Sequence, residues 1–454
     1  MLKIYNTLSK KEEEFVPIEA GKAGIYSCGP TVYNYAHIGN LRSYVFADIL
    51  KRVLQYEGLE VKHVMNITDV GHLVSDGDDG DDKMTKALKR EGLPMTLEAM
   101  KEVALKYEEV FVADLRLLNI ELPDHMPRAT DHIAEDIEII KKLEAKGFVY
   151  TTSDGVYFDT SKDVKYGALG GLSDENVARV ESNTEKKNSR DFALWKFNTE
   201  LGWETPWGKG FPGWHIECSG MSMRYLGEHF DMHTGGIDHI PIHHNNEIAQ
   251  SENATGQKYV NYWVHNAFLN VDNQKISKSL ENDIYLRTLV EKGFSPIDYR
   301  YFLLQGSYRS LVNFTWEALE ASQNALKKLK NIYLDLGTDM GALKHDYKRR
   351  FTEALDQNLN TAEALSVLWQ LANDKDMLLA DKRATLLDMD KVLGLGMESW
   401  VRDQIPAEVL ELAKTRNAAR LAKDWAKSDE LRDQIAKLGY GVLDRDEEFE
   451  IRKI

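Results

Sequence analysis

The sequence predicts an α/β protein in which a parallel sheet is followed by a helical bundle. The residues before Cys28 are typical of a β-strand, and Leu41 to Tyr56 repeat apolar residues at helical spacing, so a strand passes into a helix between them. From Trp316 to about Met397, apolar residues recur at spacings of three and four, which is typical of a helical bundle. Pro406 marks a boundary before a last, small domain.

Length and composition indicate a soluble globular chain. Its 454 residues are 43% hydrophobic and 29% charged, which suits roughly two to four domains of about 100 to 200 residues each. No segment has the unbroken apolar length of a membrane helix, and the N-terminus is charged where a signal peptide is apolar. We therefore expect a cytoplasmic protein with no membrane partner. The net charge of −16 argues against indiscriminate binding of nucleic acid, although it leaves room for a local basic face.

The strand-to-helix turn carries the first candidate site, His37-Ile-Gly39-Asn40. Gly39 permits a ligand to approach the backbone closely, and the helix N-terminus offers free N–H groups and a partial positive charge to a phosphate. Taken alone, a His after a strand is also typical of a helix cap, and the downstream Lys275-Ile-Ser-Lys278-Ser279 is also typical of a solvated loop. The presence of both motifs favours a nucleotide-phosphate site.

The two cysteines, Cys28 and Cys218, mark the second candidate site. His243 and Glu247 are four residues apart, so a helix would place both side chains on one face. With the cysteines they make a donor set of two sulfurs, one nitrogen and one oxygen, which suits tetrahedral zinc. The residues alone leave an alternative, in which the cysteines are small core residues and the pair lies on an exposed helix.

Taken together, these motifs resemble the cysteinyl-tRNA synthetases, a family of class I aminoacyl-tRNA synthetases, along essentially the whole chain. The similar stretches, in chain order, are CGPTVYNYAHIGNLRSY, NITDV, PRATDHIAEDIEIIKKL, SRDFALWK, PWGKGFPGWHIECSGMS, HTGGIDHIPIHHNNEIAQSE, KISKSLEN and RNAARLAKDWAKSDELRDQIAKLG. The resemblance implies one zinc ion per chain, held by Cys28, Cys218, His243 and Glu247. It also implies a pocket for substrate cysteine lined by Gly29, Thr68 and Trp214.

The resemblance also implies a division of the chain into five parts. A Rossmann-type parallel-sheet catalytic domain, residues 1–120 and 205–267, is interrupted by a connective insertion, residues 121–204. The later parts are a stem-contact region with the KISKS loop, the helical bundle and a small C-terminal anticodon-binding domain, at residues 268–315, 316–405 and 406–454.

The implied activity is that of a cysteine–tRNA ligase. L-Cysteine attacks the α-phosphate of ATP to give cysteinyl-adenylate and pyrophosphate, and cysteine then passes to the 3′-terminal adenosine of tRNA(Cys). Zinc that bonds the substrate thiol would select cysteine against serine, which the shape of a pocket separates weakly. Mg²⁺ is expected with ATP, and we expect a monomer. The implied catalytic residues are His37, Asn40, Lys275 and Lys278, and the implied ATP contacts are these four with Gly39, Gly235, Gly236 and Asp238.

Other functions share parts of this pattern. A ligase that joins cysteine to an amino-sugar through an adenylate has the same catalytic fold but needs no RNA-reading tail. A synthetase-like binding protein would keep affinity for tRNA or zinc without catalysis. The intact motifs and the C-terminal domain favour the synthetase over both. No G-x-G-x-x-G follows the first strand, which argues against a dinucleotide oxidoreductase.

Some positions depart from the family pattern. Asn40 stands where class I enzymes often carry His, and Ile276 and Glu281 stand where Met and Gly are common. An amide side chain still binds phosphate. The acidic stretch at residues 71–82 favours a solvated loop over a calcium site, because its carboxylates do not follow the EF-hand spacing.

The C-terminal region has a local excess of basic residues that opposes the overall charge. Between Lys414 and Lys437, seven basic residues stand against four acidic ones, which is compatible with a solvated helix face or, as the resemblance implies for this region, with tRNA contact. Trp425 lies among them and is typical either of stacking on an unpaired base or of pinning a helix to its domain.

Overall fold

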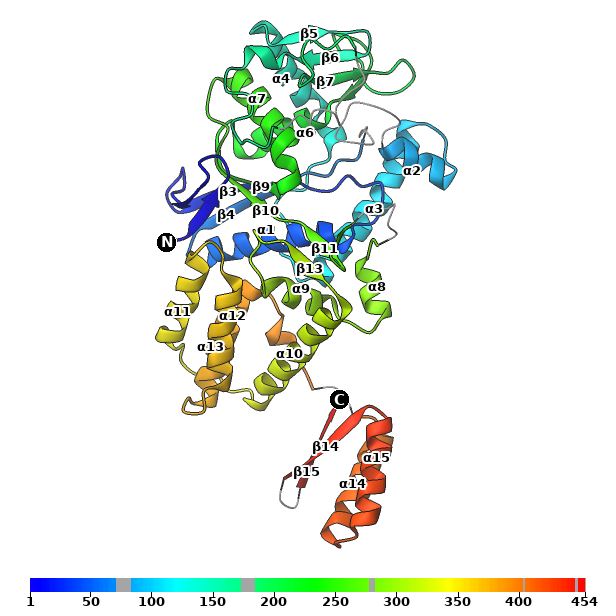
Figure 1. The fold of residues 1–454 in the computed structure, drawn as a ribbon, viewed down its shortest axis with the longest axis vertical. Helices are drawn as coiled ribbons and strands as arrows, with labels where there is room; N and C mark the ends of the chain where they lie inside the picture. The colour runs from blue at the N-terminus through cyan, green and yellow to red at the C-terminus, as the bar shows by residue number, and fades with distance from the viewer. Residues whose placement is uncertain (71–82, 173–183, 277–281, 403–404, 446–447, 454) are drawn as a thin grey trace. The chain divides into compact units, whose positions relative to one another are not determined.

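The chain folds into two separate units, Met1–Met397 and Glu398–Ile454. The computed structural model describes residues 1–70, 83–172, 184–276, 282–402, 405–445 and 448–453 (Figure 1). The predicted loop at 71–82, the catalytic candidate Lys278 and the family departure Glu281 lie outside these residues. The predicted α/β fold class is confirmed, with a parallel sheet in the first unit and helices after it.

A four-stranded parallel sheet organises the first unit, in the order β10-β9-β3-β4. The strand order reverses between β3 and β9, since β3 leads to β4 on one side and β9 leads to β10 on the other. In open parallel sheets, ligands bind at the carboxyl ends of the strands where the order reverses. The strands are β3 (Lys22–Ser27), β4 (Glu60–Met65), β9 (Phe230–Gly236) and β10 (Val260–Asn266).

Helix α1 (Ile38–Tyr56) crosses from β3 to β4 and starts inside the His37 motif, three residues earlier than the helical spacing indicated. His37 has extended backbone and accepts a hydrogen bond from the Asn40 N–H at its side chain, while the Asn40 side chain accepts one from the His37 N–H. This reciprocal pair is a capping box, which satisfies two helix-end donors. The motif that suggests phosphate binding therefore also begins the helix.

Two further groups of elements lie between β4 and β9. Helices α2 (Lys83–Glu91) and α3 (Leu97–Leu117) come first. An antiparallel sheet of order β5-β6-β7-β8 then packs with α4, α6 and α7 around a core that includes Trp195 and Phe158. This sheet continues past residue 204 to Pro212, and the predicted five-part division stays a prediction. The bounds are α4 (Ile133–Ala145), β5 (Val149–Thr151), β6 (Gly155–Phe158), β7 (Phe192–Phe197), β8 (Gly210–Pro212), α6 (Trp214–Leu226) and α7 (Asn245–Thr255).

After the parallel sheet, a small sheet of order β12-β11-β13 leads into helices. Its hairpin of β11 (Leu269–Val271) and β12 (Gln274–Lys275) ends at the first lysine of the KISKS motif. The predicted helical bundle is confirmed as α10 to α13. The remaining elements of the unit are β1 (Lys3–Asn6), β2 (Lys11–Glu14), α8 (Leu286–Glu291), α9 (Pro296–Leu304), β13 (Val312–Phe314), α10 (Trp316–Asp335), α11 (His345–Asp356), α12 (Thr361–Asn373) and α13 (Leu379–Leu393).

The second unit consists of two helices and a β-hairpin, α14 (Ala407–Leu421), α15 (Trp425–Lys437), β14 (Tyr440–Arg445) and β15 (Glu448–Lys453). Its small core contains Ala413 and Ile435, and the buried guanidinium of Arg416 pairs with Asp444. Trp425 is 60% exposed at the first turn of α15. The interpretation that it pins its helix is therefore wrong, because a pinning side chain has to be covered.

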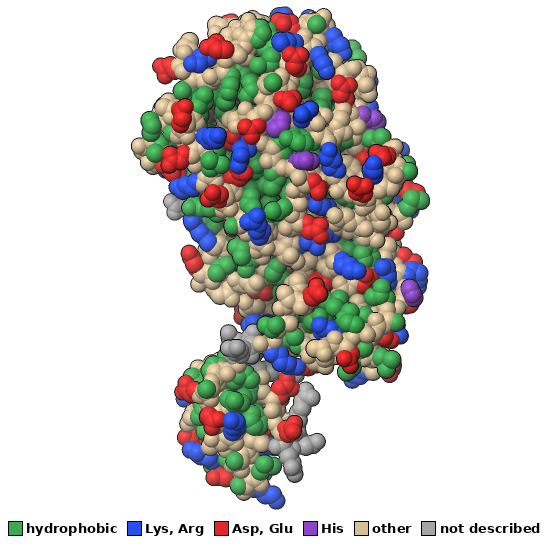
Figure 2. Space-filling view, turned by 180° about the vertical axis from the view of Figure 1, so that it is seen from behind, with side chains coloured by type: hydrophobic (Ala, Val, Ile, Leu, Met, Phe, Trp, Pro, Cys, Tyr) green, Lys and Arg blue, Asp and Glu red, His purple; other side chains and the backbone are tan. Residues whose placement is uncertain are grey.

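Charged side chains of both signs are interspersed over the face of the first unit that Figure 2 shows, rather than gathered over one element. Among the described helices, we find none with the length and apolar character that crossing a bilayer requires.

Candidate active site

A cavity of about 470 Å³ opens where the parallel strands end. Its walls come from the loop after β3, the start of α1, the loop after β4, the starts of α2 and α6, the end of β9 and the β11–β12 hairpin. Of the predicted site residues, Glu247 lies behind the wall with no exposed surface, and Lys278 is not described. All the others line this one cavity: Cys28, Gly29, His37, Gly39, Asn40, Thr68, Trp214, Cys218, Gly235, Gly236, Asp238, His243 and Lys275.

The four predicted metal ligands meet at one end of the cavity. Cys28 follows β3, Cys218 lies in α6, His243 lies in a π-helical turn (Ile240–His244), and Glu247 lies in the first turn of α7. Their ligand atoms all lie within 4.8 Å of one another. The Nε2 atom of His243 is 2.9 Å from Oε1 of Glu247, so the spacing of four does place both on one face.

A second group of possible ligands overlaps the first, with His233 and His244 in place of Cys218 and His243. Cys28 and Glu247 belong to both groups. Only the first group has three members on the cavity wall, whereas His233 and His244 are buried behind it. A metal that meets a substrate needs an accessible position, so the predicted group is the better candidate.

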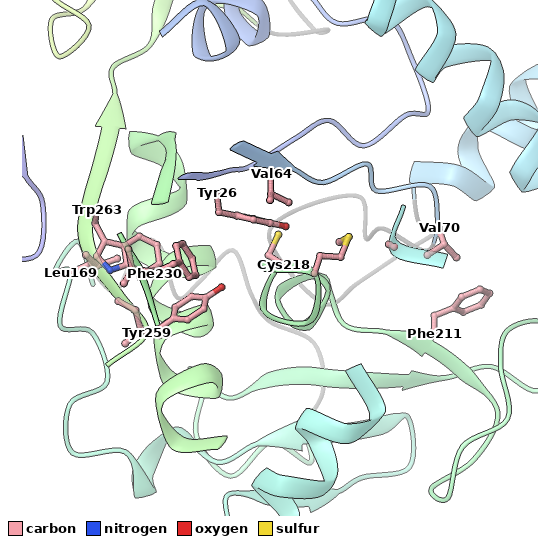
Figure 3. Packing of buried hydrophobic residues seen from close by; sticks show 13 residues of the cluster. Tyr26, Val64, Val70, Leu169, Phe211, Cys218, Phe230, Tyr259 and Trp263 are labelled. Carbon is pink, nitrogen blue, oxygen red and sulfur yellow. The ribbon is translucent and has the colours of Figure 1, made fainter. Parts of the chain in front are cut away.

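The residues of this cluster fit a zinc ion. Two thiols, an imidazole and a carboxylate are its usual protein donors. The Oε1 atom of Glu247 is buried and has no hydrogen bond of normal geometry, although His243 Nε2 is close. A buried carboxylate oxygen without such a bond is costly unless a cation is bound. Cys218 belongs to a buried hydrophobic cluster that includes Tyr26 and Phe230 (Figure 3).

The electrostatics of the cluster favour one charged thiol. Burial opposes ionisation of Cys28, but its hydrogen bond with Cys218 and its electrostatic interactions with His244 and His239 outweigh it, so the pKa of Cys28 lies well below its usual value. The pKa of Cys218 is raised, through its hydrogen bond with Cys28 and through burial. Burial also opposes protonation of His243, but the Glu247 carboxylate raises its pKa to about 10. The cluster thus balances negative charge on Cys28 and Glu247 against a proton on His243, which a bound cation would displace.

An imidazole network surrounds the ligands, and the sequence had pointed to its members His215 and His243 but not to His233, His244 and His265. His215 Nδ1 lies 2.9 Å from His243 Nδ1, and His233 Nε2 lies 2.9 Å from Glu247 Oε2. His244 Nδ1 lies 2.7 Å from His265 Nε2. Such contacts fix the orientation of ligand side chains. The sequence signal was weak, because the five histidines come from α6, β9, the π-helical turn and β10.

The opposite end of the cavity suits phosphate. It contains the N-terminus of α1, capped by His37 and Asn40, with its partial positive charge. A Cβ atom on Gly39 would lie 2.9 Å from Ile276 Cδ1 and 3.0 Å from the His37 ring, so the two signature motifs touch at this glycine. Lys275 is exposed on the cavity wall, and its Nζ lies 4.9 Å from the Phe268 ring centroid. A cation here faces any anion bound at the helix end.

Between the metal end and the phosphate end, two glycines form part of the cavity wall. A Cβ atom on Gly235 would lie 2.7 Å from the His244 ring and 2.8 Å from the His239 ring, and one on Gly236 would lie 2.2 Å from Asp238 Oδ1. At Gly235 the two imidazole rings leave no room for a side chain, whereas at Gly236 a side chain would require Asp238 to move. Asp238 is exposed at the cavity edge.

The predicted cysteine pocket adjoins the metal end. Trp214 stacks near His243, with ring centroids 4.3 Å apart, and lines the cavity instead of packing in the core. Lys83, which sequence reasoning missed, also lines the cavity, and its Nζ lies 5.9 Å from the Trp214 ring and 5.8 Å from the Tyr33 ring. No sequence pattern distinguishes Lys83 from the other lysines of α2.

Comparisons with known proteins agree with this architecture. Residues 14–324 match the family model described as the class I (C) tRNA synthetase catalytic domain, and residues 402–452 match the cysteinyl-tRNA ligase anticodon binding domain. A protein of Treponema denticola described as cysteine–tRNA ligase is 44% identical over 98% of both chains. One of Burkholderia lata, described as cysteine–tRNA ligase 1, is 46% identical over 98% of this chain and 96% of its own.

Solved structures show the likeness of the fold. The methionyl-tRNA synthetase of Mycobacterium tuberculosis in complex with methionyl-adenylate matches with a TM-score of 0.55 at 15% identity, covering 82% of this chain and 90% of its own. A leucyl-tRNA synthetase of Agrobacterium radiobacter in a ternary complex with tRNA matches with a TM-score of 0.59 at 10% identity, covering 85% of both chains.

Proposed function

The chain belongs to the cysteinyl-tRNA synthetase family of class I aminoacyl-tRNA synthetases, and we propose that it charges tRNA(Cys) with L-cysteine in two steps. Cysteine is first activated by ATP to cysteinyl-adenylate, with release of pyrophosphate, and is then transferred to the 3′-terminal adenosine of tRNA(Cys). The observation that carries this proposal is the single cavity that joins a thiol-rich metal cluster to a phosphate-binding helix end.

In the first step, the cysteine carboxylate attacks the α-phosphorus of ATP, and the bond to the β-phosphate breaks. His37 and Asn40, at the start of α1, hold phosphate oxygens with the helix N-terminus behind them. Lys275 and Lys278 neutralise charge on the departing pyrophosphate, and Mg²⁺ accompanies the nucleotide. Gly39, Gly235 and Gly236 allow ATP to approach the backbone, and Asp238 bonds the ribose.

The metal end selects the amino acid. Cys28, Cys218, His243 and Glu247 would hold zinc, which when bound would supply a Lewis acid that favours the sulfur of cysteine over the oxygen of serine. Gly29, Thr68 and Trp214 enclose the rest of the amino acid. The imidazole network keeps His243 and Glu247 oriented while substrates enter and leave.

In the second step, a hydroxyl of the terminal tRNA ribose attacks the adenylate carbonyl carbon, and AMP leaves. The match of residues 402–452 to an anticodon binding domain supports tRNA as the acceptor rather than an amino-sugar. Exposed Trp425 and the basic side chains near it on α14 and α15 would face the anticodon. A monomer in the cytoplasm remains the expectation for the assembly and location.

The experiment that tests this function is amino-acid-dependent ATP–pyrophosphate exchange across the twenty amino acids, on protein assayed in parallel for zinc. We expect exchange with cysteine alone, zinc near one per chain, and subsequent charging of tRNA(Cys) transcript. No exchange from folded, zinc-loaded protein would favour a non-catalytic binding protein. Exchange without tRNA charging would favour the amino-sugar ligase.

A further inference from the structure

A chain of buried hydrogen bonds runs behind the cysteine pocket. The backbone N–H of Gly29 donates to Asn66 Oδ1 at 2.8 Å, Asn66 Nδ2 donates to Thr68 Oγ1 at 3.1 Å, and the Thr68 hydroxyl donates to Glu217 Oε2 at 3.1 Å. Asn66, Thr68 and Glu217 are at most 3% exposed. They come from the loop after β4 and from α6, so the chain ties two elements of the pocket wall together.

The first member of this chain determines how the Asn66 amide is oriented. A backbone N–H can only donate, so the side-chain oxygen of Asn66 must face Gly29 and its NH₂ group must face Thr68. The Thr68 oxygen must then accept from Asn66. Its own hydrogen is donated to Glu217 Oε2, and an oxygen of that carboxyl can accept it whether the group is ionised or neutral.

The carboxyl group of Glu217 makes no other hydrogen bond within the described part of the chain. Its second oxygen, Oε1, is buried without a partner, and it is absent from both groups of possible metal ligands. Burying a carboxyl group costs free energy, and a single bond to a neutral hydroxyl offsets little of that cost. Because burial of the Glu217 carboxyl is unfavourable and its one hydrogen bond is to Thr68, we infer that this bond has a role.

The hydrogen-bond chain limits what the hydroxyl of Thr68, a residue that lines the cavity, can offer to a ligand. A hydroxyl has one hydrogen and two lone pairs. The hydrogen is committed to Glu217 and one lone pair to Asn66, so Thr68 presents only an acceptor to a bound ligand. Of the groups on an α-amino acid, the ammonium donates hydrogen bonds and the carboxylate does not.

We propose that Asn66 and Glu217 are positioning residues that hold the Thr68 hydroxyl as an acceptor for the α-ammonium group of the substrate. This inference rests on the proposed function, because it takes an amino acid as the ligand of this pocket. It adds to that function a device that recognises the amino group separately from the thiol. The thiol is recognised at the metal cluster, whose ligands this hydrogen-bond chain does not include.

The test compares two ligands that differ only at the amino group, L-cysteine and 3-mercaptopropionate, by calorimetric titration of the full, zinc-loaded chain. Glu217→Met removes the acceptor for the Thr68 hydrogen, which frees the hydroxyl to turn. We expect it to weaken cysteine binding about 10- to 100-fold, the range for a hydrogen bond to a charged group. Binding of 3-mercaptopropionate and of ATP should stay within about twofold of the wild-type values, because neither uses the Thr68 acceptor.

Two further variants keep the proposal open to refutation. Glu217→Gln retains a side-chain oxygen that can accept from Thr68, so we expect cysteine affinity within about threefold of wild type. Asn66→Asp replaces the donor that faces Thr68 with an acceptor, but the Thr68 hydrogen still goes to a carboxylate and its oxygen stays free to accept, so we expect cysteine affinity to stay within about threefold of wild type. Asp136→Asn is the matched control. Asp136, on α4, is also a fully buried carboxyl, it lies against Gly220 of the helix that carries Glu217, and it is outside the hydrogen-bond chain.

Three results would overturn the proposal: equal losses for both ligands in Glu217→Met, a loss in Glu217→Gln as large as in Glu217→Met, or the same selective loss in Asp136→Asn. Unchanged binding of cysteine by Glu217→Met would overturn it as well. The proposed function is judged separately, by pyrophosphate exchange in the wild-type protein. Binding differences without exchange would reject catalysis and keep the recognition device.

Discussion

The two ends of the cavity differ in how deeply their binding groups are buried. At the metal end, His243 is 2% exposed and Glu247 is fully buried, and side chains contact one another directly. At the phosphate end, Asn40 and Lys275 are exposed, and the binding groups are a helix N-terminus, a cap and a lysine. The metal end therefore consists of buried polar side chains packed together, and the phosphate end consists of exposed backbone and side-chain groups that can bind an anion.

The difference follows from what each end has to distinguish. Sulfur and oxygen differ little in size, so selection between them needs ligands that are held in place and shielded from water. A triphosphate carries several charges, so fixed dipoles and one or two cations suffice to bind it, and pyrophosphate has to leave after each turnover. We therefore expect substitutions at the two ends to have separable effects, and the predictions below test that separation.

The largest effect is expected from Cys218→Ser at the metal end. An alcohol is a poor zinc ligand, so zinc content should fall from about one per chain to near zero. The rate of cysteine-dependent exchange should fall by more than about 100-fold. This exceeds the loss that usually follows removal of a residue that hydrogen-bonds a metal ligand, because here a ligand itself is lost. ATP binding by calorimetry should be unchanged. A variant that sheds zinc yet still prefers cysteine to serine would contradict the role of the metal.

Lys275→Met tests the phosphate end. Loss of a cation that stabilises developing charge should lower kcat for pyrophosphate exchange by about 10²- to 10³-fold. Zinc content and cysteine binding should remain at the wild-type level, because Lys275 is not among the cluster ligands. Lys292→Met is the matched control, since Lys292 is also exposed and also lies over an aromatic ring, that of Trp316. Equal losses in the two variants would remove Lys275 from the mechanism.

Gly29→Ala should disturb the metal end through the backbone. The new Cβ would lie 1.7 Å from the carbonyl oxygen of Asn66, which cannot move without separating the loops after β3 and β4. Overpacking of this kind costs about 1–3 kcal/mol, so Tm should fall by several degrees. The KM for cysteine should rise more than the KM for ATP. Thermal unfolding and exchange kinetics measure both, and an equal rise in the two KM values would count against the separation.

Gly39→Ala should have the smallest effect, at the phosphate end. Its Cβ would meet the side chains of Ile276 and His37 at 2.9 and 3.0 Å, and side chains can rotate where a backbone cannot. We expect the KM for ATP to rise by less than about tenfold, with cysteine binding and zinc content unchanged. An effect on cysteine binding as large as that of Gly29→Ala would show that the two ends are coupled.

Local patterns in the sequence predicted much of the site. Residue types and spacing made the His37 motif, the cysteines and the pair His243 and Glu247 candidate ligands, and the family resemblance implied their roles. The structure brings all of them to one cavity or directly behind it. The bundle of α10 to α13 was also predicted, because its helices bury apolar residues at regular spacing. These features depend on neighbours in the chain, so sequence alone can reveal them.

The sequence by itself determined which chemical groups are available and where each strand passes into a helix. The tertiary structure decided which groups meet. For example, Cys28 Sγ lies 3.3 Å from Nε2 of His244, a residue 216 positions away in the chain. The imidazoles around the ligands, Lys83 on the cavity wall, Glu217 behind Thr68 and the exposure of Trp425 leave no periodic signal. The physical reason is that long-range contacts arise from the order of strands in the sheet, and that order is set by the packing of the whole chain rather than by any local pattern.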